Sequence, residues 1–306
     1  MAITSGITKT AAAPLAPADV QVSKFRDYVS LVKPEITFLV AISAIAGFVL
    51  GSGGNVDTVA LLIALLGISL TSAGACALNQ YYERETDRLM KRTARRALAS
   101  GRVEPRSGLI FGSALIILGL SILCPLTNPL TAILALVSVV LYLYIYTPLK
   151  KMSWTNTLVG AIPGALPVLG GYTAAANSVN IVAIILFGVL YFWQLPHFYA
   201  IAWMYKDDYR RGKYIMLPGI TRHSTATAFF ALGGTIVTIA LTIALTGPAG
   251  LSRIYLWIVL LLGALLFFPT VDFARSADPQ TARRLLKASV FYIPLFVLTV
   301  VLDALL

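Results

Sequence analysis

Long apolar stretches separated by short polar segments dominate the chain. A helix needs about 20 apolar residues to cross the roughly 30 Å hydrocarbon core of a bilayer. Nine stretches of the sequence reach or approach that length. They run over residues 36–53, 58–80, 108–126, 129–147, 156–176, 179–200, 224–246, 251–269 and 286–305. The pattern predicts an all-α polytopic membrane protein with nine transmembrane helices in a bundle.

Composition supports this assignment and removes other classes of protein. Of the 306 residues, 58% are hydrophobic and 12% are charged, and the mean hydropathy is +0.82. Ordinary soluble domains have about 45–50% apolar and about 25% charged residues. A soluble globule, a disordered chain and a disulfide scaffold are therefore excluded. The two cysteines, Cys76 and Cys124, form neither a metal-binding pair nor a disulfide framework.

The charged residues indicate how the chain is oriented. It carries 24 Lys and Arg against 13 Asp and Glu, a formal charge of +11. With nine spans, every basic residue except Arg253 falls in the N-terminal segment or in the loops after the second, fourth, sixth and eighth spans. By the positive-inside rule that side is cytoplasmic, so the N-terminus is cytoplasmic and the C-terminus lies outside. The positive charge therefore reflects the lipid bilayer and predicts no nucleic-acid partner.

The N-terminal segment differs from the rest of the chain. Residues 1–22 are rich in Ala, Thr and Pro, and they lack the apolar core of a secretory signal and the several arginines of a mitochondrial transit peptide. We expect a mobile cytoplasmic tail over residues 1–30, followed by a single transmembrane domain over residues 31–306. These features favour a bacterial cell inner membrane, with the C-terminus in the periplasm.

The predicted span 156–176 is the least regular of the nine. It contains Pro163 and Pro167 among several glycines. Proline in a membrane helix is tolerated where neighbouring helices or water satisfy the freed backbone groups. We therefore expect this span to line an interior cavity.

A stripe of oxygen-bearing side chains lies where the second span reaches the cytoplasm. If the helix continues past the interface, Asn79, Glu83 and Asp87 fall at i, i+4 and i+8 on one face. Carboxylates one turn apart repel unless a cation joins them, and oxygen ligands suit Mg²⁺ bound together with phosphates. Basic residues that could hold phosphate oxygens occupy a neighbouring stripe: Arg84, Arg88, Lys91 and Arg95. The alternative is a solvated loop whose acids merely pair with its bases.

A second acidic pair, Asp207 and Asp208, follows the sixth span. The second and sixth spans run in the same direction, so both acidic groups lie on one membrane face at matching places. This predicts two pseudo-repeated four-helix halves plus a final helix, with a site shared between the halves. Adjacent helical side chains point about 100° apart, and we favour Asp208 as the one that faces the site. Acids, bases and apolar helices together fit a ligand with a diphosphate head and a hydrocarbon tail.

Aromatic residues and a lysine share one face at the end of the fourth span. Tyr142, Tyr146 and Lys150 lie at i, i+4 and i+8. Aromatic faces can stabilise a cation that develops at a reacting carbon, and a lysine can meet a departing diphosphate. The alternative is an interfacial aromatic belt with a basic anchor.

One histidine lies inside a predicted span. It belongs to the segment Trp193-Gln194-Leu195-Pro196-His197-Phe198. Ionisable groups inside a membrane are costly to bury and are commonly functional. His197 can ligate a haem iron, exchange a proton or hydrogen-bond a neighbouring helix, and the sequence leaves these alternatives open. His223, beside Arg222 at the start of the seventh span, is typical of a solvated interface residue.

Together these residues resemble the UbiA-type intramembrane prenyltransferases. The superfamily signature N-x-x-x-D-x-x-x-D is similar to the run from Asn79 through Glu83 to Asp87. The family's R-T-x-x-R follows as Arg92, Thr93 and Arg96. Five segments resemble the haem-prenylating branch of the superfamily: Trp193-Gln194-x-Pro196-His197-Phe198, Asp208-Tyr209, Gly212, Met216-Leu217-Pro218 and Tyr146-Thr147-x-x-Lys150. The resemblance covers residues 30–303, almost the whole chain.

The sequence departs from the family pattern at three points. Glu83 stands where the family usually has Asp, which keeps the charge but moves the carboxylate oxygens. Ala97 replaces the proline that usually follows the second arginine of R-T-x-x-R. The adjacent pair Asp207 and Asp208 replaces the spaced D-x-x-x-D of many other branches.

The resemblance implies a reaction and its partners. A farnesyl group passes from farnesyl diphosphate to a vinyl group of haem B (protohaem IX), and water adds, to give haem O. The implied cofactor is Mg²⁺, and Mn²⁺ suits the same oxygen ligands. A haem A synthase or a terminal-oxidase assembly protein is the partner that the resemblance suggests for the product.

The resemblance also implies a role for each candidate residue. The metal and diphosphate would be held by Asn79, Glu83, Asp87 and Asp208. The leaving group would be neutralised by Arg92, Arg96 and Lys150, and the allylic cation steadied by Tyr142 or Tyr146. Further substrate contacts would come from Asp207, Trp193 and His197.

Three alternatives stand beside this interpretation. The first is a UbiA-type enzyme with another acceptor, such as 4-hydroxybenzoate, a naphthoate or a chlorophyllide, and the segment 193–198 argues against it. The second is a transporter, which we would expect to carry charged residues near the bilayer midplane. The third is a non-catalytic haem-binding assembly protein, which would need no carboxylate stripe.

Overall fold

The computed structural model describes residues 23–220 and 225–306, and that part of the chain forms helices and no strands. Nine of the described segments are long and apolar enough to cross a membrane, which confirms the predicted all-α, multi-pass architecture. The elements are α1 (Lys24–Leu31), α2 (Pro34–Gly51), α3 (Thr58–Leu89), α4 (Pro105–Leu126), α5 (Pro129–Val140), the π-helical η1 (Leu141–Tyr146), α6 (Thr147–Leu149), α7 (Asn156–Ala176), α8 (Ile181–Met204), α9 (Lys206–Arg211), α10 (Leu217–Ile220), α11 (Thr225–Ala244), α12 (Arg253–Ser276) and α13 (Pro279–Leu305). The fourth span runs continuously through α5, η1 and α6.

Several helices extend beyond the apolar runs that predicted them. The run 58–80 lies within α3, whose 32 residues rise about 48 Å, well beyond a 30 Å hydrocarbon core. The good helix formers that follow position 80, among them Glu83, Arg84 and Glu85, continue the helix after hydrophobicity ends. The last turns of α3 therefore project past the membrane-spanning length and carry the acidic stripe with them.

The last span also begins earlier than its apolar run predicted. Where the run begins at residue 286, α13 begins at Pro279, because Asp278 caps the helix. Its side chain accepts hydrogen bonds from the backbone N–H groups of Gln280 and Thr281, which completes a capping box. Polar residues thus supply a helical start that hydrophobicity alone does not indicate.

The last part of the predicted N-terminal tail is helical in the structure. Residues 1–22 lie outside the described residues, as do Arg222, His223 and the first residue of the predicted span 224–246. Residues 24–30, assigned from the sequence to the tail, belong to α1, and Leu31 at the end of this helix is fully buried. Asp27 of this helix is also buried and accepts a hydrogen bond from Arg102 Nε at 2.9 Å. This helix is therefore fastened to the loop that follows α3.

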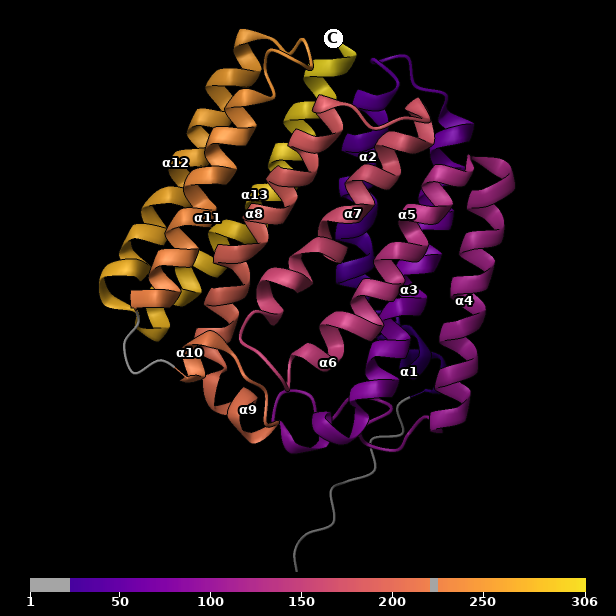
Figure 1. Cartoon of the computed structure of the whole chain (residues 1–306), viewed down its shortest axis with the longest axis vertical. Helices are drawn as coiled ribbons and strands as arrows, with labels where there is room; N and C mark the ends of the chain where they lie inside the picture. The colour runs from indigo at the N-terminus through magenta and orange to yellow at the C-terminus, as the bar shows by residue number, and fades with distance from the viewer. Residues whose placement is uncertain (1–22, 221–224) are drawn as a thin grey trace, which may run out of the picture.

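The helices form one bundle in which the C-terminal helix packs against the first span. In Figure 1, α1, α6, α9 and α10 lie at one end of the bundle, and the C-terminus lies at the other. Helix α13 packs against α2, α8 and α12, while α7 packs against α2, α5 and α8. The predicted relation between two four-helix halves stays a prediction.

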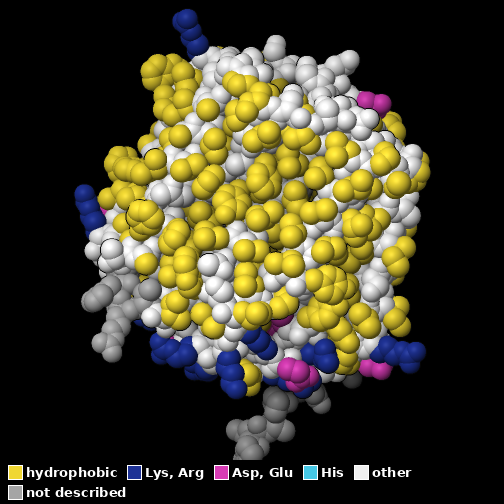
Figure 2. Space-filling model, in the orientation of Figure 1, with side chains coloured by type: hydrophobic (Ala, Val, Ile, Leu, Met, Phe, Trp, Pro, Cys, Tyr) yellow, Lys and Arg dark blue, Asp and Glu magenta, His cyan; other side chains and the backbone are white. Residues whose placement is uncertain are grey.

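Hydrophobic and basic side chains occupy different parts of the surface. Figure 2 shows hydrophobic side chains over most of one face and Lys and Arg side chains concentrated along its lower end. That end is where α6, α9 and α10 lie in the matching view of Figure 1. An apolar belt with a basic rim is what a bilayer-spanning bundle needs.

Glycines bring α2 and α7 into backbone contact. A Cβ added at Gly47 of α2 would lie 2.0 Å from the carbonyl oxygen of Val168, and one added at Gly171 of α7 would lie 2.0 Å from that of Ala44. Small residues permit such close approach between membrane helices. This crossing fixes two walls of the cavity described below.

A serine satisfies the backbone group that a proline of α7 sets free. Pro167 has no N–H, so the carbonyl of Pro163, four residues earlier, lacks its usual helical donor. Ser138 Oγ of α5 donates a hydrogen bond to that carbonyl at 3.0 Å. The irregular span predicted to line a cavity is therefore a continuous helix whose proline is compensated by its neighbour.

The α2–α7 crossing can be tested by adding a single methyl group. We expect Gly47→Ala to destabilise the protein by about 1–3 kcal/mol, because the added Cβ has no space against the α7 backbone. Thermal unfolding in detergent measures the effect. Gly233→Ala in α11 is the matched control, since nothing lies within 4 Å of a Cβ added there. Equal melting temperatures for the two variants would contradict the crossing.

Candidate active site

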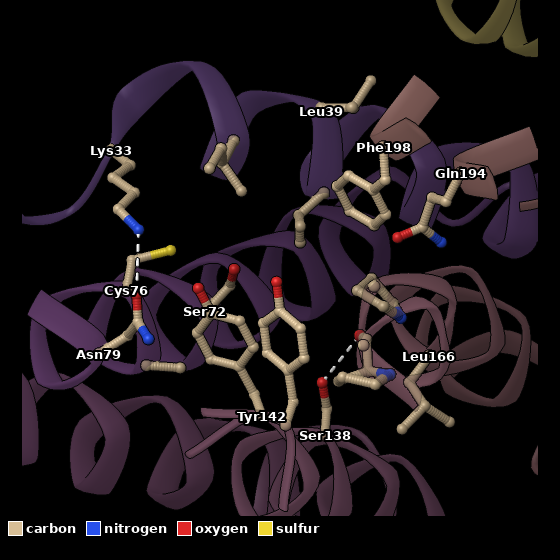
Figure 3. Close-up of a pocket in the computed structure, with 18 of the residues that line it drawn as sticks. Lys33, Leu39, Ser72, Cys76, Asn79, Ser138, Tyr142, Leu166, Gln194 and Phe198 are labelled. Atoms are coloured by element: carbon tan, nitrogen blue, oxygen red, sulfur yellow. Dashed lines mark hydrogen bonds between the residues drawn. The ribbon is translucent and has the colours of Figure 1, made fainter. Parts of the chain in front are cut away.

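A cavity of about 470 Å³ lies inside the bundle, lined by residues of α2, α3, the α5–α6 segment, α7 and α8. Figure 3 shows Lys33 and Asn79 at one end, Tyr142 in the middle, and Leu166, Gln194 and Phe198 at the other end. The cavity is therefore polar at one end and largely apolar at the other. The prediction that span 156–176 lines a cavity is confirmed, because Gly160, Pro163 and other residues of α7 form one wall.

The acidic stripe of α3 forms the polar wall. Asn79, Glu83 and Asp87 all line the cavity, and their exposed fractions are only 1%, 6% and 1%. The extension of α3 beyond its apolar run is what places them there. A solvated loop with exposed acids, the alternative that the sequence allowed, does not describe these three residues.

Each member of the stripe has a cationic partner from another segment. Lys150 Nζ lies 2.7 Å from Glu83 Oε1. Arg96 Nη1 donates to both carboxylate oxygens of Asp87, at 3.0 and 2.9 Å. Lys33 Nζ donates to the amide oxygen of Asn79 at 3.3 Å (Figure 3). Buried carboxylates need such partners, because the desolvation of an unpaired charge costs several kcal/mol.

Positive charge exceeds negative charge in the cavity. Its described lining contains two carboxylates, Glu83 and Asp87. It contains four cationic side chains, Lys33, Arg92, Arg96 and Lys150. This surplus suits a polyanion such as a diphosphate.

The two lysines respond differently to burial. Burial lowers the pKa of Lys33, and the nearby Arg96 and Lys150 cations act in the same direction. Burial also acts to lower the pKa of Lys150, but the Glu83 carboxylate outweighs it and raises that pKa above its usual value. Lys150 is therefore held as a cation, whereas an added anion would favour the charged form of Lys33.

A π-helical turn presents two tyrosines to the cavity. Within η1 the Tyr142 and Tyr146 rings stack with centroids 5.6 Å apart, and both line the cavity. Lys150 Nζ lies 4.5 Å from the Tyr146 ring centroid. A Cβ added at Gly160 of α7 would lie 2.4 Å from the Tyr146 ring, so that glycine makes room for it. The three residues predicted on one face thus meet, although through a π turn and not a regular α-helix.

The segment 193–198 of α8 forms another wall. Trp193, Gln194, His197 and Phe198 line the cavity. The Trp193 and His197 rings stack with centroids 5.3 Å apart. Gln194 Nε2 donates to the carbonyl of Ala161 in α7 at 3.1 Å. The aromatic and polar groups predicted from this motif therefore face the same space as the α3 carboxylates.

Neither aspartate of the second acidic pair, Asp207 or Asp208, is among the described residues that line the cavity, although the next residue, Tyr209, is. Both oxygens of Asp208 accept backbone N–H groups, from Lys91 at 2.9 Å and from Arg92 at 3.0 Å. Its carboxylate also pairs with Arg211. Asp207 is exposed and lies 3.6 Å from Arg210. The structure thus uses Asp208 to hold the loop after α3, and it turns Asp207 to the surface.

The ionisation of Asp208 strengthens this attachment. Burial opposes its charge, but the hydrogen bonds from Arg211 and from the backbone of Arg92 and Lys91 lower its pKa below the usual value. The hydrogen bonds to the Asp208 carboxylate are therefore at full strength above the usual pKa of Asp. They weaken only as the pH falls through the lowered pKa of Asp208.

Lys33 lines the cavity, although it was not among the predicted site residues. Its backbone adopts a left-handed conformation, with φ of 47°, immediately before Pro34 opens α2. This turn directs the side chain to Asn79. The sequence signal was the Lys33-Pro34 pair before the first span, which resembles the family pattern but carried no predicted role.

Comparison with known proteins identifies related sequences. The profile of the UbiA prenyltransferase family matches residues 40–296. A Protoheme IX farnesyltransferase of Salinibacter ruber is 44% identical over 283 residues, which cover 90% of this chain and 98% of the relative. The mitochondrial Protoheme IX farnesyltransferase of Homo sapiens is 35% identical over 276 residues, covering 88% of this chain and 60% of the relative.

Solved structures share the fold at low sequence identity. A UbiA homolog from Archaeoglobus fulgidus, bound to DMAPP and Mg²⁺, has a TM-score of 0.64 and is 15% identical, covering 90% of this chain and 99% of that one. A digeranylgeranylglyceryl phosphate synthase structure has a TM-score of 0.76 at 17% identity, covering 92% and 99%. The helical bundle is therefore one that known proteins adopt.

The role of Asp208 can be separated from that of Asp207. We expect Asp208→Ala to speed amide hydrogen exchange in the loop after α3 by about 10-fold or more, because two backbone bonds to a charged group are lost. Exchange mass spectrometry of the peptide over residues 90–104 measures this. Asp207→Ala, which removes only an exposed ion pair, should leave exchange unchanged. Unchanged exchange in both variants would show that Asp208 does not hold the loop.

Proposed function

The chain belongs to the UbiA prenyltransferase family, and we propose that it transfers a farnesyl group from farnesyl diphosphate to a vinyl group of haem B, with addition of water. The products are haem O and free diphosphate. Relatives named Protoheme IX farnesyltransferase, which match 90% and 91% of the chain, support this choice of substrates. The observation that carries the proposal is one buried cavity in which a cation-rich end adjoins an apolar end.

The cation-rich end receives the diphosphate. Lys150, Arg96 and Lys33 reach it from three different segments, and each already contacts the α3 stripe. Arg92 also lines the cavity, with its guanidinium 5.2 Å from the Tyr205 ring centroid. These side chains neutralise negative charge as it accumulates on the leaving group. Asp208 contributes indirectly, by holding the backbone that carries Arg92.

The α3 stripe fits a magnesium ion. Asn79, Glu83 and Asp87 present hard oxygen donors on one wall of the cavity, and Mg²⁺ prefers such donors together with substrate phosphates. When bound, the ion supplies further neutralisation of the diphosphate. A UbiA homolog of the same fold is bound to DMAPP and Mg²⁺, which supports this choice. Manganese suits the same donors.

Tyr142 stabilises the cation that forms when the carbon–oxygen bond of the farnesyl diphosphate breaks. A developing allylic cation is attracted to an aromatic face. The Tyr146 ring already lies 4.5 Å from the Lys150 ammonium, so its face is occupied by a cation. Tyr142, stacked on Tyr146 and one turn deeper, is the free ring of the pair. It also adjoins Ser138 and the apolar part of the cavity (Figure 3).

The apolar end holds the farnesyl chain and the acceptor. The vinyl group's terminal carbon bonds to the farnesyl carbon, and water captures the cation left on the neighbouring carbon, with release of a proton. The surrounding helices limit the access of water to the allylic cation. Trp193 and His197 are the aromatic and polar groups that contact the haem in this proposal.

The polar end of the cavity faces the cytoplasm of a bacterial cell. The described loops at that end carry most of the basic residues, which supports this orientation by the positive-inside rule. The N-terminus is then cytoplasmic and the C-terminus periplasmic. A haem A synthase or a terminal-oxidase assembly protein would receive the product.

The proposed reaction has a direct test. Detergent-purified protein incubated with haem B, farnesyl diphosphate and Mg²⁺ should convert the porphyrin to a species heavier by farnesyl plus water, as seen by mass spectrometry of the extract. EDTA should abolish the conversion, because the α3 oxygens then lack their metal. Diphosphate release with unchanged haem would indicate another acceptor, whereas neither change in folded protein would refute the proposal.

Asp87 provides a test of the α3 stripe. We expect Asp87→Ala to insert and fold but to lose at least about 100-fold in turnover, because the carboxylate contacts the metal and diphosphate region. The matched control is Glu85→Ala. It removes an exposed carboxylate of the same helix, one that is paired with Arg88. That variant should retain turnover near the unaltered level. Near-normal turnover in folded Asp87→Ala would remove Asp87 from the site.

A further inference from the structure

One residue of α13 orients both rings of the α8 motif. Ser289 is fully buried, and its backbone carbonyl accepts a hydrogen bond from Trp193 Nε1 at 2.9 Å. Its side-chain Oγ lies 3.0 Å from His197 Nδ1. The stacked Trp193 and His197 rings are therefore anchored to two oxygen atoms of a single residue. Ser289 itself belongs to no sequence motif that pointed to the site.

The hydrogen-bond partners of Ser289 determine the tautomer of His197. A serine hydroxyl has one proton, and Ser289 Oγ lies in donor position 2.8 Å from the carbonyl oxygen of Leu286. If the hydroxyl donates to Leu286, then His197 Nδ1 must carry a proton and donate to Oγ, which gives two hydrogen bonds. If it donated to Nδ1 instead, only one bond would form. In a buried, low-dielectric setting the fully bonded arrangement is favoured.

This tautomer leaves the other ring nitrogen as a lone-pair donor. With the proton on Nδ1, Nε2 is unprotonated. No hydrogen bond to Nε2 is present among residues 23–220 and 225–306, and His197 lines the cavity. Histidine that binds a metal through one nitrogen characteristically donates its other N–H to an oxygen acceptor, as His197 donates to Ser289. The imidazole is therefore pre-oriented to act as a metal ligand.

Gln194 and Phe198, which flank His197 in the α8 motif, lie at the apolar end of the cavity (Figure 3). The same cavity contains the cation-rich end. A porphyrin whose iron is held by His197 would therefore share one cavity with the region where the prenyl group is released.

We propose that His197 binds the iron of the haem substrate through Nε2, and that Ser289 is the positioning residue that sets its tautomer. This inference rests on the proposed function, since it takes haem B as the acceptor. It assigns iron ligation to the one imidazole that the cavity contains within the described chain. It also gives the last helix a part in acceptor binding.

Resonance Raman spectroscopy of ferrous haem B bound to the full-length protein tests the ligand. We expect an iron–histidine stretching band that shifts when the protein is labelled with ¹⁵N-histidine. The chain has only two histidines, so assignment is simple. The band should be lost in His197→Ala and retained in His223→Ala, the control for the other imidazole.

Ser289→Ala tests the positioning role. We expect haem affinity to fall by about 10-fold to 100-fold and the iron–histidine band to move to lower frequency, because the imidazole loses its acceptor. Thr299→Ala is the matched control on α13, since within the described part of the chain its hydroxyl donates only to the backbone carbonyl of Leu295. Its spectrum should match that of the unaltered protein.

The outcomes separate this inference from the proposed function. Conversion of haem B to haem O with a spectrum that is indifferent to His197→Ala would overturn iron ligation and leave the function standing. If His197→Ala reduced turnover but left the iron–histidine band unchanged, His197 would be assigned to proton transfer, and iron ligation would again be overturned. An unaltered protein that neither binds nor converts haem B would refute both.

Discussion

Burial of two carboxylates in the wall of a membrane-embedded cavity is the constraint on which the rest of this structure depends. Glu83 and Asp87 are 6% and 1% exposed, and each would be costly to bury alone. Their partners come from different parts of the chain, Lys150 after the fourth span and Arg96 in the loop after α3. The loop in turn is held by Asp208, from beyond the sixth span. Charge pairing thus joins three distant segments at one end of the bundle.

Close helix contacts make that convergence possible. At Gly47 and Gly171 the backbones of α2 and α7 touch, and at Gly160 the α7 backbone accommodates the Tyr146 ring. With larger residues at these positions the walls would separate and the cations would no longer reach the α3 stripe. The compensated proline of α7 serves the same purpose, since Ser138 satisfies its freed carbonyl and the wall stays intact. Packing and electrostatics therefore depend on each other here.

The sequence predicted most of the fold because hydrophobicity and charge alternate so regularly along it. Nine spans and an acidic stripe on one helix follow from periodicity alone, and the structure confirms them. The helix ends were less predictable, since polar helix formers extend α3 and a capping box starts α13 early. The tertiary partners of Asp208 could not be predicted, because helical geometry separates the directions of two neighbouring aspartates but does not show which groups each one meets. Ser289 was equally hidden, since a lone serine on an apolar helix carries no pattern.

In the proposed function, the ion pairs in the cavity wall constrain how the diphosphate substrate binds. Lys150 and Arg96 already pair with Glu83 and Asp87, so a bound diphosphate would compete with these carboxylates for the two cations. If a cation left its carboxylate alone in the buried wall, the cost would be about 3–5 kcal/mol for each broken pair. That cost is avoided when a divalent cation and the diphosphate arrive together, because the carboxylates then keep a positive neighbour. Among residues 23–220 and 225–306, neither Lys33 nor Arg92 forms an ion pair with a carboxylate, so these two cations can receive the anion first.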